Sequence, residues 1–273
     1  MVNRRFFVIG NWKMNCDFNK VKSNLEFLNA GQLNKDAEVV VAPSAPYIFY
    51  VKENLKAPNV QIALQNCYTE TFGSYTGEVS AVMGADVGCR WVILGHPERR
   101  TKFDEKDEFI GKKIKHVLST TNLSVIACLC EVTEDRRQNK TEEIVSKQME
   151  AIADNVDDWS RVVIAYEALW TLDTGKPATP DQAQEVVGGI RRWLEENVSE
   201  KVAESTRILY AGYVSASNCK EFSEKPDIDG FLVGGASLKP EFVQIVNAKD
   251  SNIKVEENEV SKGCWMRLCQ CFV

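Results

Sequence analysis

The side chains best suited to chemistry in this sequence stand just after short apolar runs. Glu167 follows Val162–Tyr166, a run typical of a strand buried on both faces, and we expect that burial to end at the carboxylate. His96 follows a second apolar run, and Asn11 and Lys13 follow a third near the N-terminus. A carboxylate, an imidazole and an ammonium group gathered at one edge of a sheet could abstract a proton next to a carbonyl.

His96 is one of two histidines in the chain. It precedes Pro97 and Glu98, a pair typical of the first turn of a helix. The partial positive charge of a helix N-terminus disfavours imidazolium, so we expect a neutral imidazole that can polarise a carbonyl. Neither His96 nor His116 stands near a cysteine or in an HxH spacing, so the sequence predicts no transition-metal site.

Lys13 stands beside Asn11 rather than inside an apolar run, which favours a fixed positive charge over a Schiff-base nucleophile. Gly234 and Gly235 precede the helix-compatible segment 237–240, where backbone N–H groups can approach an anion. A Gly-Gly turn is a weak signal by itself. Combined with a carboxylate base, a neutral histidine and a lysine, it indicates proton abstraction on a small phosphorylated substrate.

The segment after Glu167 has the composition of a long ordered loop. Residues 168–177 mix Trp, Thr, Asp, Gly and Pro with neither helical nor strand period. A helix start at Thr179-Pro180-Asp181 ends the segment. The pattern predicts a catalytic base followed by a lid, although a strand-capping glutamate beside an ordinary surface loop would read the same way.

Short apolar runs alternate with helix-compatible stretches along the whole chain. Eight runs have the character of strands: 6–9, 39–42, 60–64, 91–94, 124–128, 162–165, 208–210 and 231–233. Eight such units in about 250 residues predict an α/β fold, a (β/α)8 barrel; a doubly wound open sheet is the alternative that periodicity does not exclude. In either fold the active site lies at the carboxyl ends of the strands, where Glu131 would join Glu167 at one mouth.

Composition excludes several classes of protein. The formal net charge of −6, with basic residues spread along the chain, argues against a nucleic-acid-binding face. Nine dispersed cysteines, some inside apolar runs, indicate reduced thiols rather than a secreted disulfide scaffold. No segment has the length of a signal-peptide core or a membrane span, so we expect a cytoplasmic protein.

Six motifs, taken together and in order, closely resemble triosephosphate isomerase. The resemblance runs in register from about Phe6 to Lys249, nearly the whole chain. The motifs are Gly10-Asn11-Trp12-Lys13-Met14-Asn15, Gln65-Asn66-Cys67-Tyr68, Leu94-Gly95-His96-Pro97-Glu98-Arg99-Arg100, Ala165-Tyr166-Glu167, Thr174-Gly175-Lys176 and the segment from Gly230 to Leu238. The order of six motifs is far more specific than any one of them.

The resemblance implies a homodimeric TIM barrel that interconverts dihydroxyacetone phosphate and D-glyceraldehyde 3-phosphate, in glycolysis and gluconeogenesis, without cofactor or metal. In the family's terms, Glu167 would abstract the carbon-bound proton, His96 would polarise the carbonyl, and Lys13 with Asn11 would stabilise the enediolate. Closure of the loop 168–178 would exclude water. The loop 67–79 would dock into the partner subunit, with its Thr76 reaching the partner's active site.

Several positions depart from the family's pattern. Ala168 replaces a proline at the first hinge of the lid, and Asp173 replaces a glycine whose N–H would bind the substrate phosphate. In the loop after the seventh strand, Ala211 replaces a glycine and Tyr213 replaces a serine at another phosphate contact. Two further replacements, Pro97 for serine and Cys130 for glycine, touch no proton-transfer group. The expected substrate-binding residues are Asn11, Lys13, Asp173, Tyr213, Gly234 and Gly235.

Two hypotheses follow from this pattern. The first is a working isomerase with a weakened phosphate clamp, favoured because Asn11, Lys13, His96 and Glu167 are all present. The second is a catalytically impaired relative retained as a binding or structural protein. We expect one barrel domain over residues 1–250 and a disordered, cysteine-rich C-terminal tail over 251–273, for which membrane contact through acylated cysteines is the less favoured reading.

Overall fold

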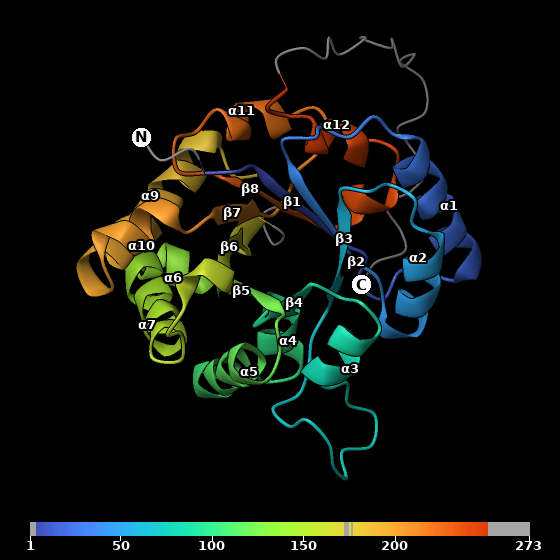
Figure 1. Ribbon diagram of the computed structural model, residues 1–273. Helices are drawn as coiled ribbons and strands as arrows, with labels where there is room; N and C mark the ends of the chain where they lie inside the picture. Colours follow the sequence, from blue (N-terminus) through green and yellow to red (C-terminus); the bar gives the residue numbers. More distant parts are fainter. Residues whose placement is uncertain (1–3, 172–174, 176, 251–273) are drawn as a thin grey trace.

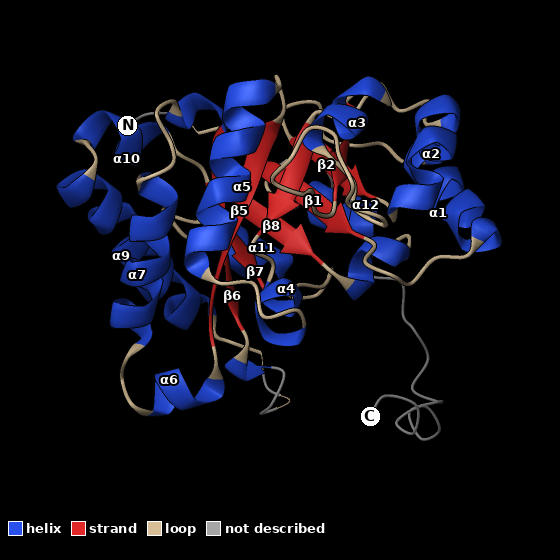
Figure 2. Cartoon of the chain, turned by 90° about the horizontal axis from the view of Figure 1, so that it is seen from below, coloured by secondary structure: helices blue, strands red, loops and turns tan. Residues whose placement is uncertain are grey.

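Eight parallel strands form a closed barrel in the computed structural model, which describes residues 4–171, 175 and 177–250. The strands pair in sequence order, and the last pairs with the first, Phe7 with Gly230 through Gly10 with Val233. Helices form a ring around the strands (Figures 1 and 2). This closure confirms the predicted (β/α)8 barrel and excludes the doubly wound open sheet, whose edge strands would be unpaired.

The strands lie close to the predicted apolar runs, with two differences. Their bounds are β1 Phe7–Asn11, β2 Glu38–Ala42, β3 Val60–Leu64, β4 Trp91–Leu94, β5 Ser124–Glu131, β6 Val162–Ala168, β7 Ile208–Ala211 and β8 Gly230–Val233. β5 and β6 are each three residues longer than predicted. They extend because they pair with each other over seven residues, from Val125 with Val162 to Glu131 with Ala168, and this pairing keeps polar side chains in the sheet.

Helices connect the strands and cover the outside of the barrel. They are α1 Phe18–Ala30, α2 Ile48–Asn54, α3 Ala81–Asp86, α4 Pro97–Lys102, α5 Asp107–Thr120, α6 Thr133–Arg137, α7 Thr141–Ala153, α9 Pro180–Asn197, α10 Glu200–Ser205, α11 Cys219–Ser223 and α12 Phe242–Val246, with 3-10 turns at Ala45–Tyr47, Trp159–Arg161 and Gly235–Leu238. The predicted helix start after the lid segment is confirmed, because Thr179 and Gln182 form a capping box at the first turn of α9.

Alternate side chains along each strand build two separate apolar cores. One lies between the strands and the outer helices, and a smaller one fills the barrel interior with residues such as Phe7, Ile126 and Leu209. Closure between β8 and β1 depends on Gly230, whose φ is +152° and where a Cβ would lie 1.7 Å from the Phe7 carbonyl oxygen. Only glycine permits so close an approach.

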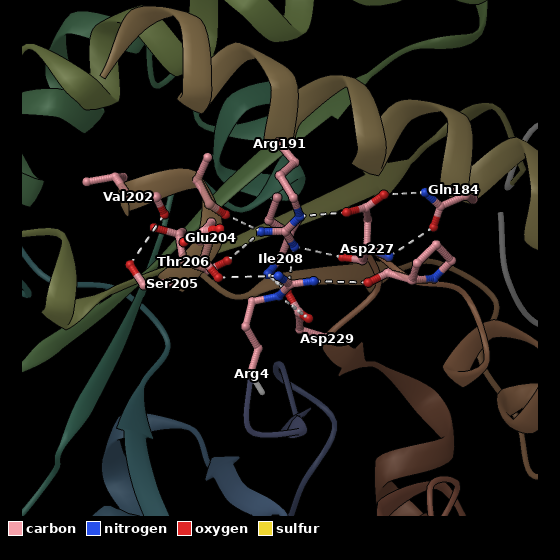
Figure 3. A network of polar contacts seen from close by, with 12 residues as sticks. Arg4, Gln184, Arg191, Val202, Glu204, Ser205, Thr206, Ile208, Asp227 and Asp229 are labelled. Atoms are coloured by element: carbon pink, nitrogen blue, oxygen red, sulfur yellow. Dashed lines mark hydrogen bonds and ion pairs between the residues drawn. The ribbon is translucent and has the colours of Figure 1, made fainter. Parts of the chain in front are cut away.

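A partly buried network of charges closes the amino end of the barrel (Figure 3). The guanidinium of Arg191, on α9, donates to Asp227 and to Asp229 at 2.7 Å each, and Arg4 donates to Asp229 at 2.7 Å. Asp229 also accepts the backbone N–H of Ile208, the first residue of β7, at 2.9 Å. Each of these charges has a partner, so ion pairs and hydrogen bonds stabilise the amino end of the barrel. The carboxyl end is therefore the candidate location of a functional site.

None of the described helices combines the length and the apolar character that crossing a bilayer requires. Asp173 and the tail 251–273, for which the sequence led to predictions, lie outside the described residues.

Candidate active site

Glu167 lies inside β6, not beyond its end. The whole strand through Ala168 is buried, and Glu167 itself is 9% exposed, so the expectation that burial stops at this residue was wrong. The reason is pairing on both sides: Glu167 lies opposite Cys130 of β5 and Ala211 of β7. Burial raises the pKa of Glu167, the charge of Lys13 opposes the rise, and Glu98 adds to it. A carboxylate in this setting is a stronger base than one in water.

His96 caps the N-terminus of α4 and is 4% exposed. Its Nδ1 accepts the backbone N–H of Glu98 at 3.3 Å, which places the proton of the neutral ring on Nε2. Nε2 lies 3.7 Å from Oε2 of Glu167. Burial first, and then the charge of Lys13, lower the pKa of His96 to about 4, against the opposing charge of Glu98. This lowered pKa favours the neutral imidazole expected from the sequence, with burial rather than the helix terminus as its main cause.

The backbone of Lys13 is held in a left-handed conformation, with φ at +52°. Its N–H donates to Oδ1 of Asn11 at 3.0 Å, and its carbonyl accepts from Oγ of Ser44 at 2.6 Å and from Nε2 of Gln65 at 2.8 Å. A non-glycine residue in this region is strained, so three hydrogen bonds from β1, the segment after β2 and the end of β3 stabilise it. These bonds place Asn11 and Lys13 side by side at the carboxyl end of β1, and their roles toward substrate stay predictions.

Glu98 is a residue of the site to which sequence reasoning assigned no role. Its Oε1 accepts from Nζ of Lys13 at 2.9 Å, and it lies in the first turn of α4 beside His96. Burial opposes its ionisation, but the hydrogen bond and charge of Lys13 outweigh that effect and lower the pKa of Glu98. Its position two residues after His96, close to a strand's carboxyl end, was the available signal. For Ser44 and Gln65, only their places after strands could have indicated a role.

Gly234 and Gly235 lie next to Lys13. A Cβ on Gly234 would be 3.8 Å from Cε of Lys13, and a Cβ on Gly235 would meet nothing within 4 Å. Ser237 donates to the Gly234 carbonyl at 2.6 Å and so fixes the turn. Gly234 therefore brings backbone close to a cation and Gly235 borders open space, as an anion site requires.

Tyr213 and Asp173 are the two remaining residues predicted to contact the substrate phosphate. Tyr213 follows Gly212, whose φ is +144°, and its side chain is 61% exposed while its carbonyl accepts from Asn218 at 2.9 Å. A residue this exposed presents its ring to solvent. Asp173 lies outside the described residues.

Glu131 was expected at the mouth with Glu167 but is instead a buried support. Its Oε1 accepts from the hydroxyl of Tyr166 at 2.7 Å and from Nε1 of Trp170 at 3.1 Å. These bonds tie the end of β5 to β6 and to the first residues after it. Glu131 therefore holds the strand that carries Glu167 rather than facing substrate.

The arrangement combines a buried carboxylate of raised pKa, a neutral imidazole with a proton on Nε2, and a cation beside a glycine turn. Such a set can take a proton from carbon and stabilise the negative charge that develops on an adjacent oxygen. Within residues 4–171, 175 and 177–250, no cluster of three or more His, Cys, Asp or Glu side chains is placed to hold a metal ion.

Comparisons with known proteins agree with this chemistry. The family model described as triosephosphate isomerase matches residues 6–249. A curated relative from Neurospora crassa, itself named triosephosphate isomerase, is 52% identical over 245 residues, which cover 90% of this chain and 98% of the relative.

Proposed function

The chain belongs to the triosephosphate isomerase family, and we propose that Glu167, His96 and Lys13 perform its catalysis. The protein is an isomerase that interconverts dihydroxyacetone phosphate and D-glyceraldehyde 3-phosphate. The observation that carries the assignment of residues is the 3.7 Å separation of Glu167 Oε2 and His96 Nε2, both buried at the carboxyl ends of their strands.

In the first step, the carboxylate of Glu167 takes the proton from the carbon next to the carbonyl. The electron pair of that C–H bond forms the double bond of an enediolate, and the carbonyl oxygen gains negative charge. The Nε2–H of His96 hydrogen-bonds this oxygen, and the ammonium of Lys13 stabilises its charge. The proton of the neighbouring hydroxyl must also move to the former carbonyl oxygen. His96 can carry it, since its Nε2–H gives a proton to the anionic oxygen and the ring then takes the proton of the other hydroxyl. Return of the proton from Glu167 to the neighbouring carbon then completes the isomerisation, with His96 and Glu167 restored.

Neutral His96 suits this role because its proton stays available at working pH. A pKa of about 4 means that the hydrogen-bond donor at working pH is neutral imidazole rather than imidazolium. The charge of Lys13 contributes twice, since it opposes protonation of His96 and attracts the anionic substrate.

The substrate phosphate would be bound by the backbone N–H groups of Gly234 and Gly235. We propose that Asp173 and Tyr213 weaken this clamp, the first by adding a negative charge near a dianion and the second by replacing a small hydroxyl side chain. Weaker phosphate binding raises KM and lowers kcat in part, because the binding energy of the phosphate also orients the reacting carbon.

A homodimer through the loop 67–79 is supported by the apolar surface on and around it. The segment joining β3 to α3 projects from the barrel (Figure 1). Phe72 on this loop is 75% exposed, and Met14, beside Lys13, is 93% exposed. Covering such side chains with a second copy would bury both the loop and the edge of the active site. Sedimentation of the wild-type protein and of Phe72→Ser tests this: we expect a dimer that the substitution weakens, and a wild-type monomer would contradict it.

We further propose that the protein acts in the cytoplasm, in glycolysis and gluconeogenesis, on the strength of its reaction and of cysteines that are all free among the described residues. The division into a barrel of residues 1–250 and a tail of 251–273 remains a prediction.

Isomerase activity of the purified protein tests the residue assignments directly. Glu167→Gln should lower kcat by about 10²- to 10⁴-fold with little change in KM, because the amide keeps the shape but cannot accept a proton. Asp173→Gly and Tyr213→Ser should lower KM if the clamp is weakened. A Glu167→Gln variant as active as the wild type would contradict the mechanism, and an inactive wild type whose clamp variants are also inactive would favour a binding or structural protein.

A further inference from the structure

The carboxyl end of β5 has a strand neighbour on one side only. β6 pairs with β5 through Glu131, whereas β4 pairs only from Ser124 to Ala127. In a strand, the N–H and C=O of alternate residues point to the same side. Ser124 bonds toward β4 through its N–H to Arg90, so Cys128 and Cys130 must point their backbone groups to that same, unpaired side.

Two side chains take the place of the missing strand. Arg100 donates from Nη2 to the Cys128 carbonyl at 3.2 Å. Gln148, on α7, accepts the Cys130 N–H on Oε1 at 2.9 Å and donates from Nε2 to the Cys130 carbonyl at 2.8 Å. The amide of Gln148 thus satisfies both backbone groups of Cys130 that a neighbouring strand would otherwise satisfy, and Gln148 and Cys130 are both buried.

The residue held in this way is the neighbour of the proposed base. Cys130 lies opposite Glu167 in the β5–β6 register. The two peptide groups that Gln148 binds carry, at their other ends, the Leu129 carbonyl and the Glu131 N–H, which by strand alternation point toward β6. Fixing these two peptide planes therefore fixes the hydrogen-bonding partners of the backbone around Glu167.

We propose that Gln148 is a positioning residue for the isomerase reaction, acting through Cys130 to hold the Glu167 carboxylate at its working place. The inference rests on the proposed role of Glu167 as the base. The position of the Glu167 carboxylate matters for the rate, because a displacement of a reacting group by about 1 Å can lower the rate by about 10²-fold.

Gln148→Met removes both hydrogen bonds while keeping the length of the side chain. We expect kcat to fall by about tenfold or more, with KM changed by less than about twofold, because the phosphate site at β8 is untouched. The matched control is Gln184→Met. Gln184 makes a similar two-sided contact, donating to Asp227 Oδ2 at 2.6 Å and accepting the Asp227 N–H at 3.2 Å, but at the amino end of β8 (Figure 3).

Gln148→Glu provides a second readout that a purely structural role would not give. The introduced carboxyl can accept the Cys130 N–H in either state, but only its protonated form can donate to the Cys130 carbonyl. Burial raises the pKa of such a carboxyl. The kcat of Gln148→Glu relative to wild type should therefore recover as the pH falls from about 8 to about 5. Glu105, Lys106, Asp107, Glu108, Asp135 and Arg100 line the same cleft. The pH profile of Gln148→Met is the reference for any effect of these groups on kcat, because all of them are present in that variant. Its kcat relative to wild type should not recover as the pH falls.

The outcomes separate this inference from the proposed function. A Gln148→Met enzyme whose kcat stays within about twofold of wild type, or a Gln148→Glu profile parallel to that of Gln148→Met, overturns the positioning role while leaving the isomerase intact. Equal losses of kcat in Gln148→Met and Gln184→Met also overturn it, because the effect would then follow general destabilisation. An inactive wild-type protein overturns the proposed function first.

Discussion

Replacing His96 by glutamine should make the protein more resistant to acid relative to wild type. Packing around the imidazole lowers its pKa from an ordinary 6.5 to about 4 in the folded chain. A group whose folded pKa is depressed in this direction binds its proton more readily when unfolded. Stability is therefore complete above pH 6.5 and is lost as the pH falls toward 4.

The size of the effect follows from the shift. One pKa unit corresponds to about 1.4 kcal/mol, so the shift of His96 is worth about 3 kcal/mol once the pH is below the folded pKa. At about pH 5, where the unfolded imidazole is charged and the folded one is mostly neutral, the loss is about 2 kcal/mol. His96→Gln keeps a neutral hydrogen-bonding side chain and has no proton to gain, so it escapes this loss.

Urea unfolding of both proteins between about pH 8 and pH 5 measures the difference. Protein concentration must be equal, because a dimer is stabilised by mass action. The raised pKa of Glu167 increases stability as the pH falls, opposite to the effect of His96, but this contribution is common to wild type and His96→Gln. His116→Gln is the matched control: it removes the other histidine, keeps His96, and should retain the acid-side loss. If wild type and His96→Gln lose stability in parallel, to within about 0.5 kcal/mol, the account of a neutral, buried His96 is refuted.

Two other substitutions have outcomes that the structure determines. Glu98→Gln removes the charged partner that holds Nζ of Lys13 at 2.9 Å, so steady-state assays should show kcat/KM lower by about tenfold, or about 1.4 kcal/mol. Gly230→Ala should lower the free energy of unfolding in urea by about 3 kcal/mol or more, because the added Cβ would lie 1.7 Å from the Phe7 carbonyl oxygen at a φ that alanine avoids.

Each has a control elsewhere in the chain. Glu143→Gln removes a similar ion pair with Lys147 on the exposed face of α7 and should leave kcat/KM within about twofold of wild type. Gly189→Ala adds a Cβ inside α9 where the nearest atom is 3.8 Å away, so it should raise stability by about 0.5 to 1 kcal/mol. Full isomerase efficiency in Glu98→Gln, or an unchanged unfolding midpoint in Gly230→Ala, would contradict the contacts described above.

The sequence by itself determined the existence of the eight strands, the order of strand and helix, and the positions of Lys13, His96 and Glu167 at or near the carboxyl ends of strands. These features are local: apolar runs of strand length, helix starts such as Thr179-Pro180, and residue types at fixed offsets are all written in neighbouring residues. The order of six motifs also indicated the family, which the comparisons confirmed.

Only the tertiary structure decided how far β5 and β6 extend, why His96 is neutral and what holds Glu167. Cys130 and Gln148 are 18 residues apart, and Lys13 and Glu98 are 85 apart, so no local pattern joins them. The pKa values depend on how many atoms exclude water from each group, which is a property of packing. Periodicity can place a side chain at the mouth of a barrel, but the partners that fix its proton and its position come from segments that meet only after folding.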